Sequence, residues 1–197
     1  MHLLRAAAEC FMERGFHATS IDDVARRIRA TKGLVYYHFL SKMDLFFEVY
    51  RVGMAALTEA VAAARKTEHA GLPAVTAMLE AHALTMFEYH AFEHVVAQGV
   101  QLHRFSAMTS VQRMTFDELV ASRDRLEQMY RTEVAAAQAD GSVSGDTEPS
   151  IAVKTILGGI QWSVIWWRPE ADQGLEARLV LARQMVRTLI RGLEVRR

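Results

Sequence analysis

The sequence predicts an all-α protein, and three observations support this fold class. Apolar residues recur at a spacing of three to four positions along most of the 197 residues. Valine and isoleucine nowhere alternate with polar residues for long enough to indicate strands. The chain contains only three prolines, and its eleven glycines are scattered rather than clustered, so the helical pattern is seldom interrupted.

Capping and turn residues between the apolar runs predict about nine helices, three short ones followed by six longer ones. Gly15 is expected to end the first helix as a C-terminal cap. Ser20 and Asp23 make a near capping box at the start of the second helix, and Thr31 can cap the third. The helices are expected at residues 1–15, 20–28, 31–39, 41–66, 73–90, 91–105, 110–139, 148–167 and 174–194.

Composition narrows the class of function. The formal net charge is zero and the pI is about 7.1, so any binding of nucleic acid must depend on a local basic patch. Cys10, the single cysteine, is expected to be a buried thiol. No signal peptide and no apolar run of about 20 residues is recognisable. The sequence therefore indicates a soluble, cytoplasmic protein that needs no cofactor.

Residues 20–39 fit a helix, a tight turn and a second helix, which together make a helix-turn-helix. The second helix of such a unit lies in the major groove and reads base edges from its first turns. Val35 and Phe39 lie four residues apart and can face the core. Facing the core with them are Ile21, Val24 and Ile28. The outward arc comprises Lys32, Gly33, Leu34, Tyr36, Tyr37 and His38.

This outward arc has the chemistry of a DNA-binding surface. Gly33 lets the backbone approach the duplex, and Lys32 can reach a phosphate or a guanine edge. Tyrosine hydroxyls and the His38 ring suit phosphate contacts. Lys42 opens the next helix, where its ammonium and the free N–H groups can meet a phosphate. Between residues 20 and 42, five basic residues stand against two aspartates.

The first 50 residues resemble the DNA-binding region of the tetracycline-repressor (TetR) family of transcriptional regulators. The features that carry the resemblance are Phe11, Gly15-Phe16, Thr19-Ser20, Ile21, Ala25, Lys32-Gly33, Tyr36-Tyr37-His38-Phe39 and Ser41-Lys42. The resemblance implies a DNA-binding domain over residues 1–45 and a ligand-binding and dimerisation domain over 46–197. It also implies phosphate roles for Thr31, Tyr37, His38 and Lys42, and base-facing roles for Lys32, Gly33, Leu34 and Tyr36.

The sequence departs from the family pattern at two places. Arg29 stands in the turn where the family usually has glycine. If that position needs a positive φ, arginine costs roughly 1 kcal/mol there, although it could offer an extra phosphate contact. The chain also starts almost inside its first helix, so any arm that enters the minor groove is expected to be short.

The second half of the chain is rich in methionine and aromatic residues, with histidine and glutamine interspersed. This composition favours a mostly apolar cavity with a few polar anchors for a small effector. The stretch GGIQWSVIWWRP, residues 158–169, has a weaker similarity to TetR-type regulators that respond to acyl-CoA thioesters. The candidate effector-binding residues are Met86, Tyr89, His90, His94, Gln98, Phe116, Trp162 and Trp166.

The last two predicted helices, 148–167 and 174–194, indicate a homodimer. They carry more apolar surface than a single core-facing stripe needs, and Gly158-Gly159 permits close helix approach. A two-fold seam would bury this surface. Pairing would also place two DNA-binding heads on half-sites of a palindromic operator, about one DNA turn or a multiple of it apart.

These observations favour a ligand-responsive transcriptional regulator, most simply a repressor, and leave two alternatives open. HAFEH at residues 90–94 matches the H-x-x-E-H pattern of zinc peptidases. His90 and His94 could share a helix face, although no third ligand stands out, so a metalloenzyme is one alternative. The other is a dimeric helical interaction protein that no longer binds DNA, which the Arg29 departure leaves open.

Overall fold

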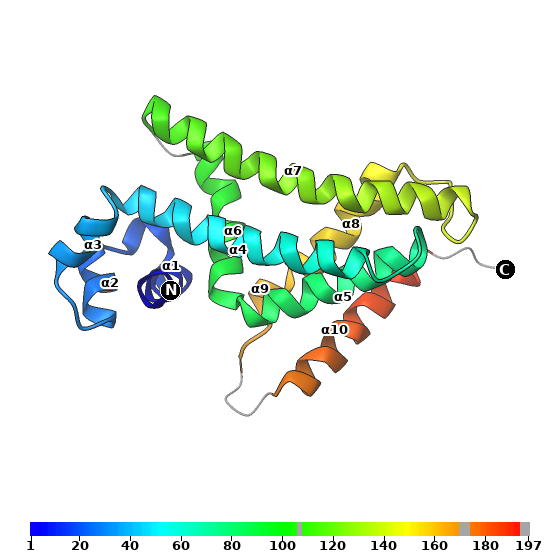
Figure 1. Ribbon diagram of the computed structural model, residues 1–197, viewed down its shortest axis with the longest axis horizontal. Helices are drawn as coiled ribbons and strands as arrows, with labels where there is room; N and C mark the ends of the chain where they lie inside the picture. The colour runs from blue at the N-terminus through cyan, green and yellow to red at the C-terminus, as the bar shows by residue number, and fades with distance from the viewer. Residues whose placement is uncertain (106–107, 170–173, 194–197) are drawn as a thin grey trace. The chain divides into compact units, whose positions relative to one another are not determined.

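A computed structural model describes residues 1–105, 108–169 and 174–193, and this part of the chain is built from α-helices without a β-strand. The all-α prediction is confirmed, and so are about nine helices, because α9 is a single turn that directly follows α8 (Figure 1). The helices are α1 His2–Ala18, α2 Ile21–Arg27, α3 Lys32–His38, α4 Lys42–Arg65, α5 Leu72–Glu88, α6 His90–Phe105, α7 Ser110–Ala139, α8 Pro149–Gln161, α9 Ser163–Trp166 and α10 Leu175–Ile190.

The local signals predicted for the first three helices are present. Gly15 has φ 77° and ψ 165°, which breaks the helical path of α1 three residues before its end. Ser20 caps α2 in a full capping box: its side chain accepts the Asp23 N–H, and the Asp23 carboxylate accepts the Ser20 N–H. The Thr31 hydroxyl accepts the N–H of Leu34 and caps α3.

The chain forms two compact units. Unit 1 comprises residues 1–55 and 89–123, and unit 2 comprises residues 56–88 and the chain from residue 124 onward. Helices α4 and α7 contribute to both. The boundary that we expect at residue 45 divides the chain by function, and it stays a prediction.

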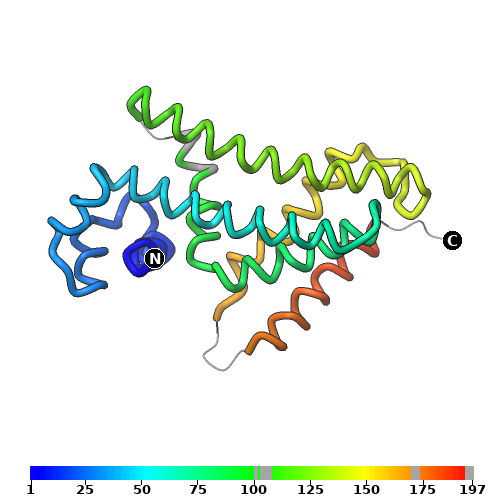
Figure 2. Tube along the Cα trace, viewed as in Figure 1, coloured from blue at the N-terminus to red at the C-terminus, as the bar shows by residue number. Residues whose placement is uncertain are grey.

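In unit 1, α1 packs against α6 and α2, and α2 packs against α3. The trace of these first helices can be followed in Figure 2. Phe11 of α1 is fully buried, with its ring centroid 5.4 Å from that of Phe46 in α4. Cys10 is a buried free thiol, as predicted. The Gln98 side chain donates a hydrogen bond of 2.8 Å to the Phe11 carbonyl, which links α6 directly to α1.

Glycines let α4 and α6 approach closely inside unit 1. A Cβ atom on Gly99 would lie 2.5 Å from the Tyr50 ring, and one on Gly53 would lie 3.0 Å from Val96. The distance at Gly99 is shorter than a carbon–carbon contact allows, and the distance at Gly53 is tighter than most such contacts. These two positions therefore hold the helices at a separation that a side chain would increase.

In unit 2, α5 packs against α8, α9 and α10. Two buried side chains of this unit form well-defined hydrogen bonds. The Tyr130 hydroxyl donates to the Met78 carbonyl at 3.0 Å. Glu133, which is only 3% exposed, accepts hydrogen bonds from Arg65 and from the Gly71 N–H. The Glu133 carboxylate thus ties the start of α5 to the end of α4. Within the described residues, none of the helices combines the length and apolarity of a membrane span.

Candidate nucleic-acid interface and effector site

Helix α3 is attached to unit 1 by very little of its surface. Among its seven residues, only Val35 is buried, with no exposed area. The helix is closed at its start by the Thr31 cap and at its end by the Phe39 N–H, which donates to the Val35 carbonyl at 2.9 Å. Phe39 lies directly after the helix and is half-buried. Val35 therefore faces inward, as its spacing predicts.

The side chains expected on the outward arc are exposed. Tyr37 is 83% exposed, Leu34 45% and Tyr36 43%. The other outward residues, Thr31, Lys32, Gly33 and His38, are also exposed. The structure thus brings seven of the eight predicted DNA-contacting residues onto one accessible helix. Their contacts with bases and phosphates stay predictions.

The Lys32 ammonium is oriented by contacts within unit 1. Its ammonium lies 3.3 Å from an Asp22 carboxylate oxygen and 5.7 Å from the centroid of the Tyr36 ring. Both the lysine and the aspartate side chains are about half exposed, so this ion pair contributes little to stability. It orients the ammonium beside the outward face of α3.

The side chain of the eighth predicted residue, Lys42, is engaged in hydrogen bonds within unit 1. Its ammonium donates hydrogen bonds to the carbonyls of Phe16, His17 and Thr19 at 2.7, 3.2 and 2.7 Å. It also lies 4.5 Å from the centroid of the Phe16 ring. Burial lowers the pKa of Lys42. The ammonium therefore satisfies carbonyls at the end of α1. A phosphate near Lys42 would instead meet the backbone N–H groups at the start of α4.

The predicted effector residues are divided between the two units. Tyr89, His90, His94, Gln98 and Phe116 belong to unit 1, whereas Met86, Trp162 and Trp166 belong to unit 2. Phe116 is fully buried, with its ring 5.3 Å from Phe47 and 6.1 Å from Tyr50. The Gln98 amide is engaged with α1 through Phe11. Phe116 and Gln98 therefore contribute to the packing of unit 1, and their contact with an effector stays a prediction.

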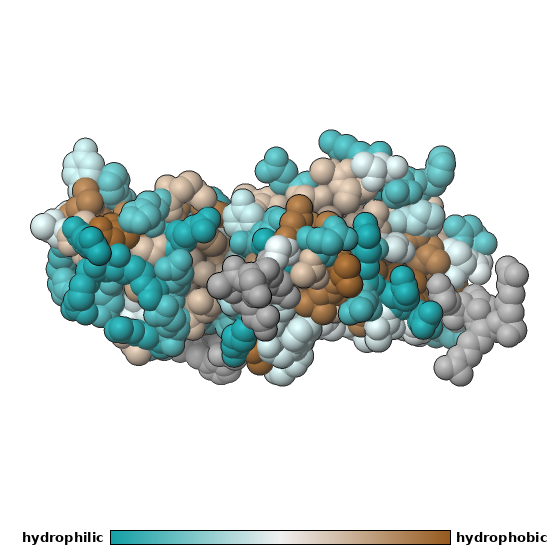
Figure 3. Space-filling model, turned by 90° about the horizontal axis from the view of Figure 1, so that it is seen from below, coloured by the Kyte–Doolittle hydropathy of each residue, from teal (hydrophilic) through white to brown (hydrophobic). Residues whose placement is uncertain are grey.

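The two tryptophans are not enclosed within the chain. Trp162 is 63% exposed and Trp166 is 47% exposed. Trp166 lines a groove of about 310 Å³ with α8 and α10, bordered by Gly159, Met185 and Leu189. Figure 3 shows further apolar side chains, in brown, exposed among polar ones on one face of the molecule. By contrast, Met86 is buried, with its sulfur 3.9 Å from the Ser163 hydroxyl.

The H-x-x-E-H pattern includes Glu93 of α6 but does not predict its burial. Glu93 is 3% exposed, and its Oε1 atom is buried and has no hydrogen-bond partner among the described residues. Burial raises the pKa of Glu93 to about 8, against a smaller opposing effect of Arg123. The carboxyl lies against α4: a Cβ on Gly53 would be 3.3 Å from Oε1. At neutral pH this buried side chain is therefore largely uncharged.

The histidines that flank Glu93 do not form a metal site with it. The ring centroids of His90 and His94 are 5.0 Å apart and nearly perpendicular. Across the described ranges, no group of three or more His, Cys, Asp or Glu side chains could hold a metal ion. The structure does not support the metalloenzyme alternative.

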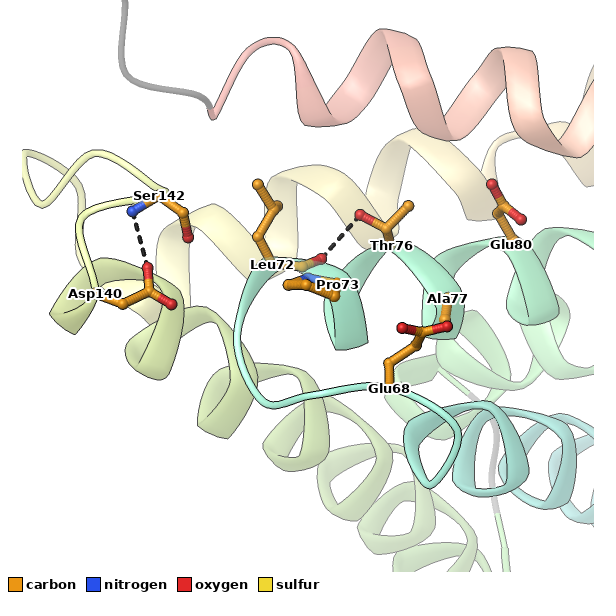
Figure 4. A pocket seen from close by; sticks show the side chains of 8 residues that line it. All are labelled: Glu68, Leu72, Pro73, Thr76, Ala77, Glu80, Asp140 and Ser142. Carbon is orange, nitrogen blue, oxygen red and sulfur yellow. Dashed lines mark hydrogen bonds between the residues drawn. The ribbon is translucent and has the colours of Figure 1, made fainter.

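Unit 2 contains a pocket of about 730 Å³ that no predicted effector residue lines (Figure 4). Its walls come from α5 and from the segments around residues 68 and 140. Three carboxylates surround it, and the Asp140 side chain accepts the Ser142 N–H in a local turn. The lining residues are Glu68, Leu72, Pro73, Thr76, Ala77, Glu80, Asp140 and Ser142. Such acidic walls repel anionic ligands.

Comparison with known proteins gives a consistent result for both parts of the chain. Residues 3–49 match the family described as bacterial regulatory proteins of the tetR family. Residues 74–193 match the tetracyclin repressor-like C-terminal domain. Together these two matches cover most of the sequence.

Individual relatives agree with the family matches. The chain is 26% identical over 191 residues to the HTH-type transcriptional repressor KstR2 of Rhodococcus jostii, covering 97% of this chain and 89% of that protein. It superposes on the TetR-family regulator PfmR of Thermus thermophilus with a TM-score of 0.78, at 26% identity and 98% and 99% coverage. The fold is also that of AibR solved with isovaleryl coenzyme A and operator DNA (TM-score 0.74, 21% identity, 98% and 96% coverage).

The buried Glu93 carboxyl predicts a specific dependence of stability on pH. A glutamate in an unfolded chain titrates near 4.5, whereas folding raises the pKa of Glu93 to about 8. The folded state therefore holds a proton that the unfolded state loses. The stabilisation is complete below about pH 4.5 and is lost as pH rises toward 8. The Glu93→Gln variant, which cannot ionise, should lose less Tm than the wild type between pH 5.5 and 8.5.

This prediction is measured by thermal unfolding at both pH values. Glu59→Gln is a matched control, because Glu59 is exposed on α4, and its Tm profile should follow the wild type. If the profiles of Glu93→Gln and wild type run parallel over this range, Glu93 is not held neutral in the folded protein.

Proposed function

Because the chain belongs to the tetracycline-repressor (TetR) family of transcriptional regulators, and is a DNA-binding regulator rather than an enzyme, we propose that it represses transcription from a palindromic operator in the cytoplasm until a small, largely apolar effector releases it. The observation that carries the proposal is the exposure of α3. A helix that buries Val35 alone leaves its remaining side chains accessible to a duplex.

Each exposed side chain of α3 has a proposed task. Lys32, Gly33, Leu34 and Tyr36 lie in the first turns of the helix and face base edges. Leu34 offers only apolar contact, for which a thymine methyl group is the suitable partner in the major groove. Thr31, Tyr37 and His38 contact phosphates, together with the N–H groups at the start of α4.

The homodimer is proposed to form through α8, α9 and α10. A Cβ on Gly158 would meet nothing within 4 Å, so this position is open to a helix of a second copy. Members of the family typically pair in this way. Burial of this apolar face against the same face of a second copy would stabilise a two-fold interface. Its large exposed side chains are Ile151, Trp162, Ile165, Trp166, Leu175 and Val180.

The effector is proposed to be an acyl-CoA thioester. Support comes from the similarity of residues 158–169 to regulators that respond to such thioesters, and from AibR, whose structure holds isovaleryl coenzyme A. Tyr89, His90 and His94 in unit 1 are retained as candidate effector contacts, and so, separately, is Met86 in unit 2. Trp162 and Trp166 could contribute to a site completed by the second copy.

The proposed coupling between effector and DNA is a population shift. Helix α6 carries His90, Glu93 and His94, and its Gln98 is hydrogen-bonded to α1 of the DNA-binding head. A ligand that prefers a different position of α6 would therefore also favour a different position of α1. A change in the separation of two heads would then end their simultaneous fit to two half-sites.

The DNA-binding part of the proposal is tested with the wild type and the Lys32→Ala/Tyr37→Ala double variant. The wild type should give a specific gel-shift band on the DNA that flanks its own gene. The double variant should bind that DNA at least tenfold more weakly, because each subunit then lacks one side chain for a base edge and one for a phosphate, while its Tm stays within a few degrees of wild type. A wild type that gives no specific band would contradict the proposal.

The dimer interface is tested by Trp162→Glu. Placing a charge in an interface that excludes water should shift the protein from dimer to monomer in light scattering after size-exclusion chromatography. Operator affinity should fall with it. Val111→Glu is the control, because Val111 is 71% exposed on α7 and lies outside the proposed interface. A Trp162→Glu protein that stays dimeric would place the interface elsewhere.

The effector class is tested by thermal shift with isovaleryl-CoA, longer acyl-CoA thioesters and free coenzyme A. An acyl-CoA that binds the folded protein at 100 times its Kd should stabilise it by about 2.7 kcal/mol and release the operator in the gel shift. Free coenzyme A should do much less, because it lacks the acyl group. If none of the thioesters raises Tm, the effector proposal fails while the DNA-binding proposal stands.

A further inference from the structure

The turn between α2 and α3 contains the most unusual backbone conformation of the described chain. Arg29 has φ 55°, and it is the single non-glycine residue with a positive φ in the part of the chain that the structure describes. This is the left-handed region, where the Cβ of an L-residue crowds the following carbonyl oxygen. A glycine at this position would avoid that crowding.

The hydrogen bonds at the end of α2 require this conformation. The Ala30 N–H donates to the Ala25 carbonyl at 2.9 Å, and the Arg29 N–H donates to the Arg26 carbonyl at 3.1 Å. These two bonds form the Schellman motif, in which the residue after the helix cap is left-handed. Arg29 occupies that position. The turn therefore cannot relax to a negative φ without breaking the bonds that end α2.

The other cations between residues 20 and 42 are already engaged inside unit 1. Arg26 pairs with Asp23 at 3.3 Å, and Lys32 pairs with Asp22 at 3.3 Å. Arg27 meets Glu13 at 2.6 Å, and Lys42 is bound to the carbonyls at the end of α1. The Arg29 side chain is exposed and forms no ion pair or hydrogen bond with any other described residue. Within the described chain, the Arg29 side chain therefore forms no ion pair or hydrogen bond that would offset the strain of its backbone.

We propose that Arg29 is a phosphate-binding residue of the operator complex, and that the strained turn serves to place its side chain against the DNA backbone. The inference rests on the proposed function. Arg29 stands two residues before the Thr31 cap of α3, so a duplex that meets the start of α3 would bring a phosphate strand close to it. A guanidinium can bind a phosphate through two parallel N–H···O bonds. Strained residues cluster at functional sites, where the strain is part of the mechanism.

The test uses three variants of the full chain, each measured for Tm and for Kd on operator DNA and on a non-specific duplex over a range of salt concentrations. Arg29→Gly removes the strain and the charge. Arg29→Asn removes the charge with a side chain that tolerates positive φ. Arg29→Lys keeps the charge. Thermal unfolding shows whether each variant folds.

We expect Arg29→Gly to raise Tm by roughly 1 to 3 °C and yet to bind DNA several-fold more weakly. The slope of log Kd against log salt should fall by about 0.9 for each phosphate that is no longer neutralised, or about 1.8 for a dimer. Arg29→Asn should show the same decrease in slope. Arg29→Lys should keep the slope, because a lysine still neutralises the phosphate.

Two results would overturn the inference. Unchanged affinity and salt slope in Arg29→Gly would show that Arg29 does not touch DNA. Weaker binding with an unchanged slope would show that Arg29 acts through the shape of the turn rather than through its charge. Either result leaves the proposed function standing, whereas a wild type that binds neither duplex would remove the proposed function and this inference together.

Discussion

The DNA-binding surface depends on the attachment of α3 through a single buried side chain. A seven-residue helix is too short to be stable alone, so α3 must be held by its surroundings. Val35 is its one fully buried residue, the Thr31 hydroxyl caps its start, and the neighbouring α2 is fixed by the Ser20 capping box. Because these few contacts are enough to order the helix, its outward side chains are not needed for the core. They stay exposed, and only Lys32 among them is paired, with the half-exposed Asp22.

The positive charge of the first 45 residues is largely used to build the head. Lys42 satisfies carbonyls at the end of α1, and Arg27 joins α2 to Glu13 of α1. Basic residues of the local patch thus hold the first helices together, although the whole chain has no net charge. These pairings also leave a small set of groups for DNA: the exposed face of α3, the start of α4 and Arg29. Inside unit 1, the neutral Glu93 lies where α6 meets α4.

The features that the sequence predicts well are local. Ser20, Asp23 and Thr31 act within three residues of their partners, and Gly15 and Arg29 act through their own φ. The outward arc of α3 follows from helical periodicity around Val35. The roles that sequence reasoning missed depend on contacts between distant residues. Lys42 reaches back more than 20 residues to α1, and the burial of Glu93 depends on the close approach of α4 at Gly53. The exposure of Trp162 and Trp166 likewise depends on what covers their helix, which aromatic content alone does not show.

Two copies of α3 are proposed to enter successive major grooves of one duplex. This arrangement can be tested by hydroxyl-radical footprinting on an operator selected from random duplexes. We expect two protected patches per strand on one face of the DNA, with centres about 10 to 10.5 base pairs, or a multiple of that spacing, apart. A single patch, or uniform protection without this spacing, would contradict it.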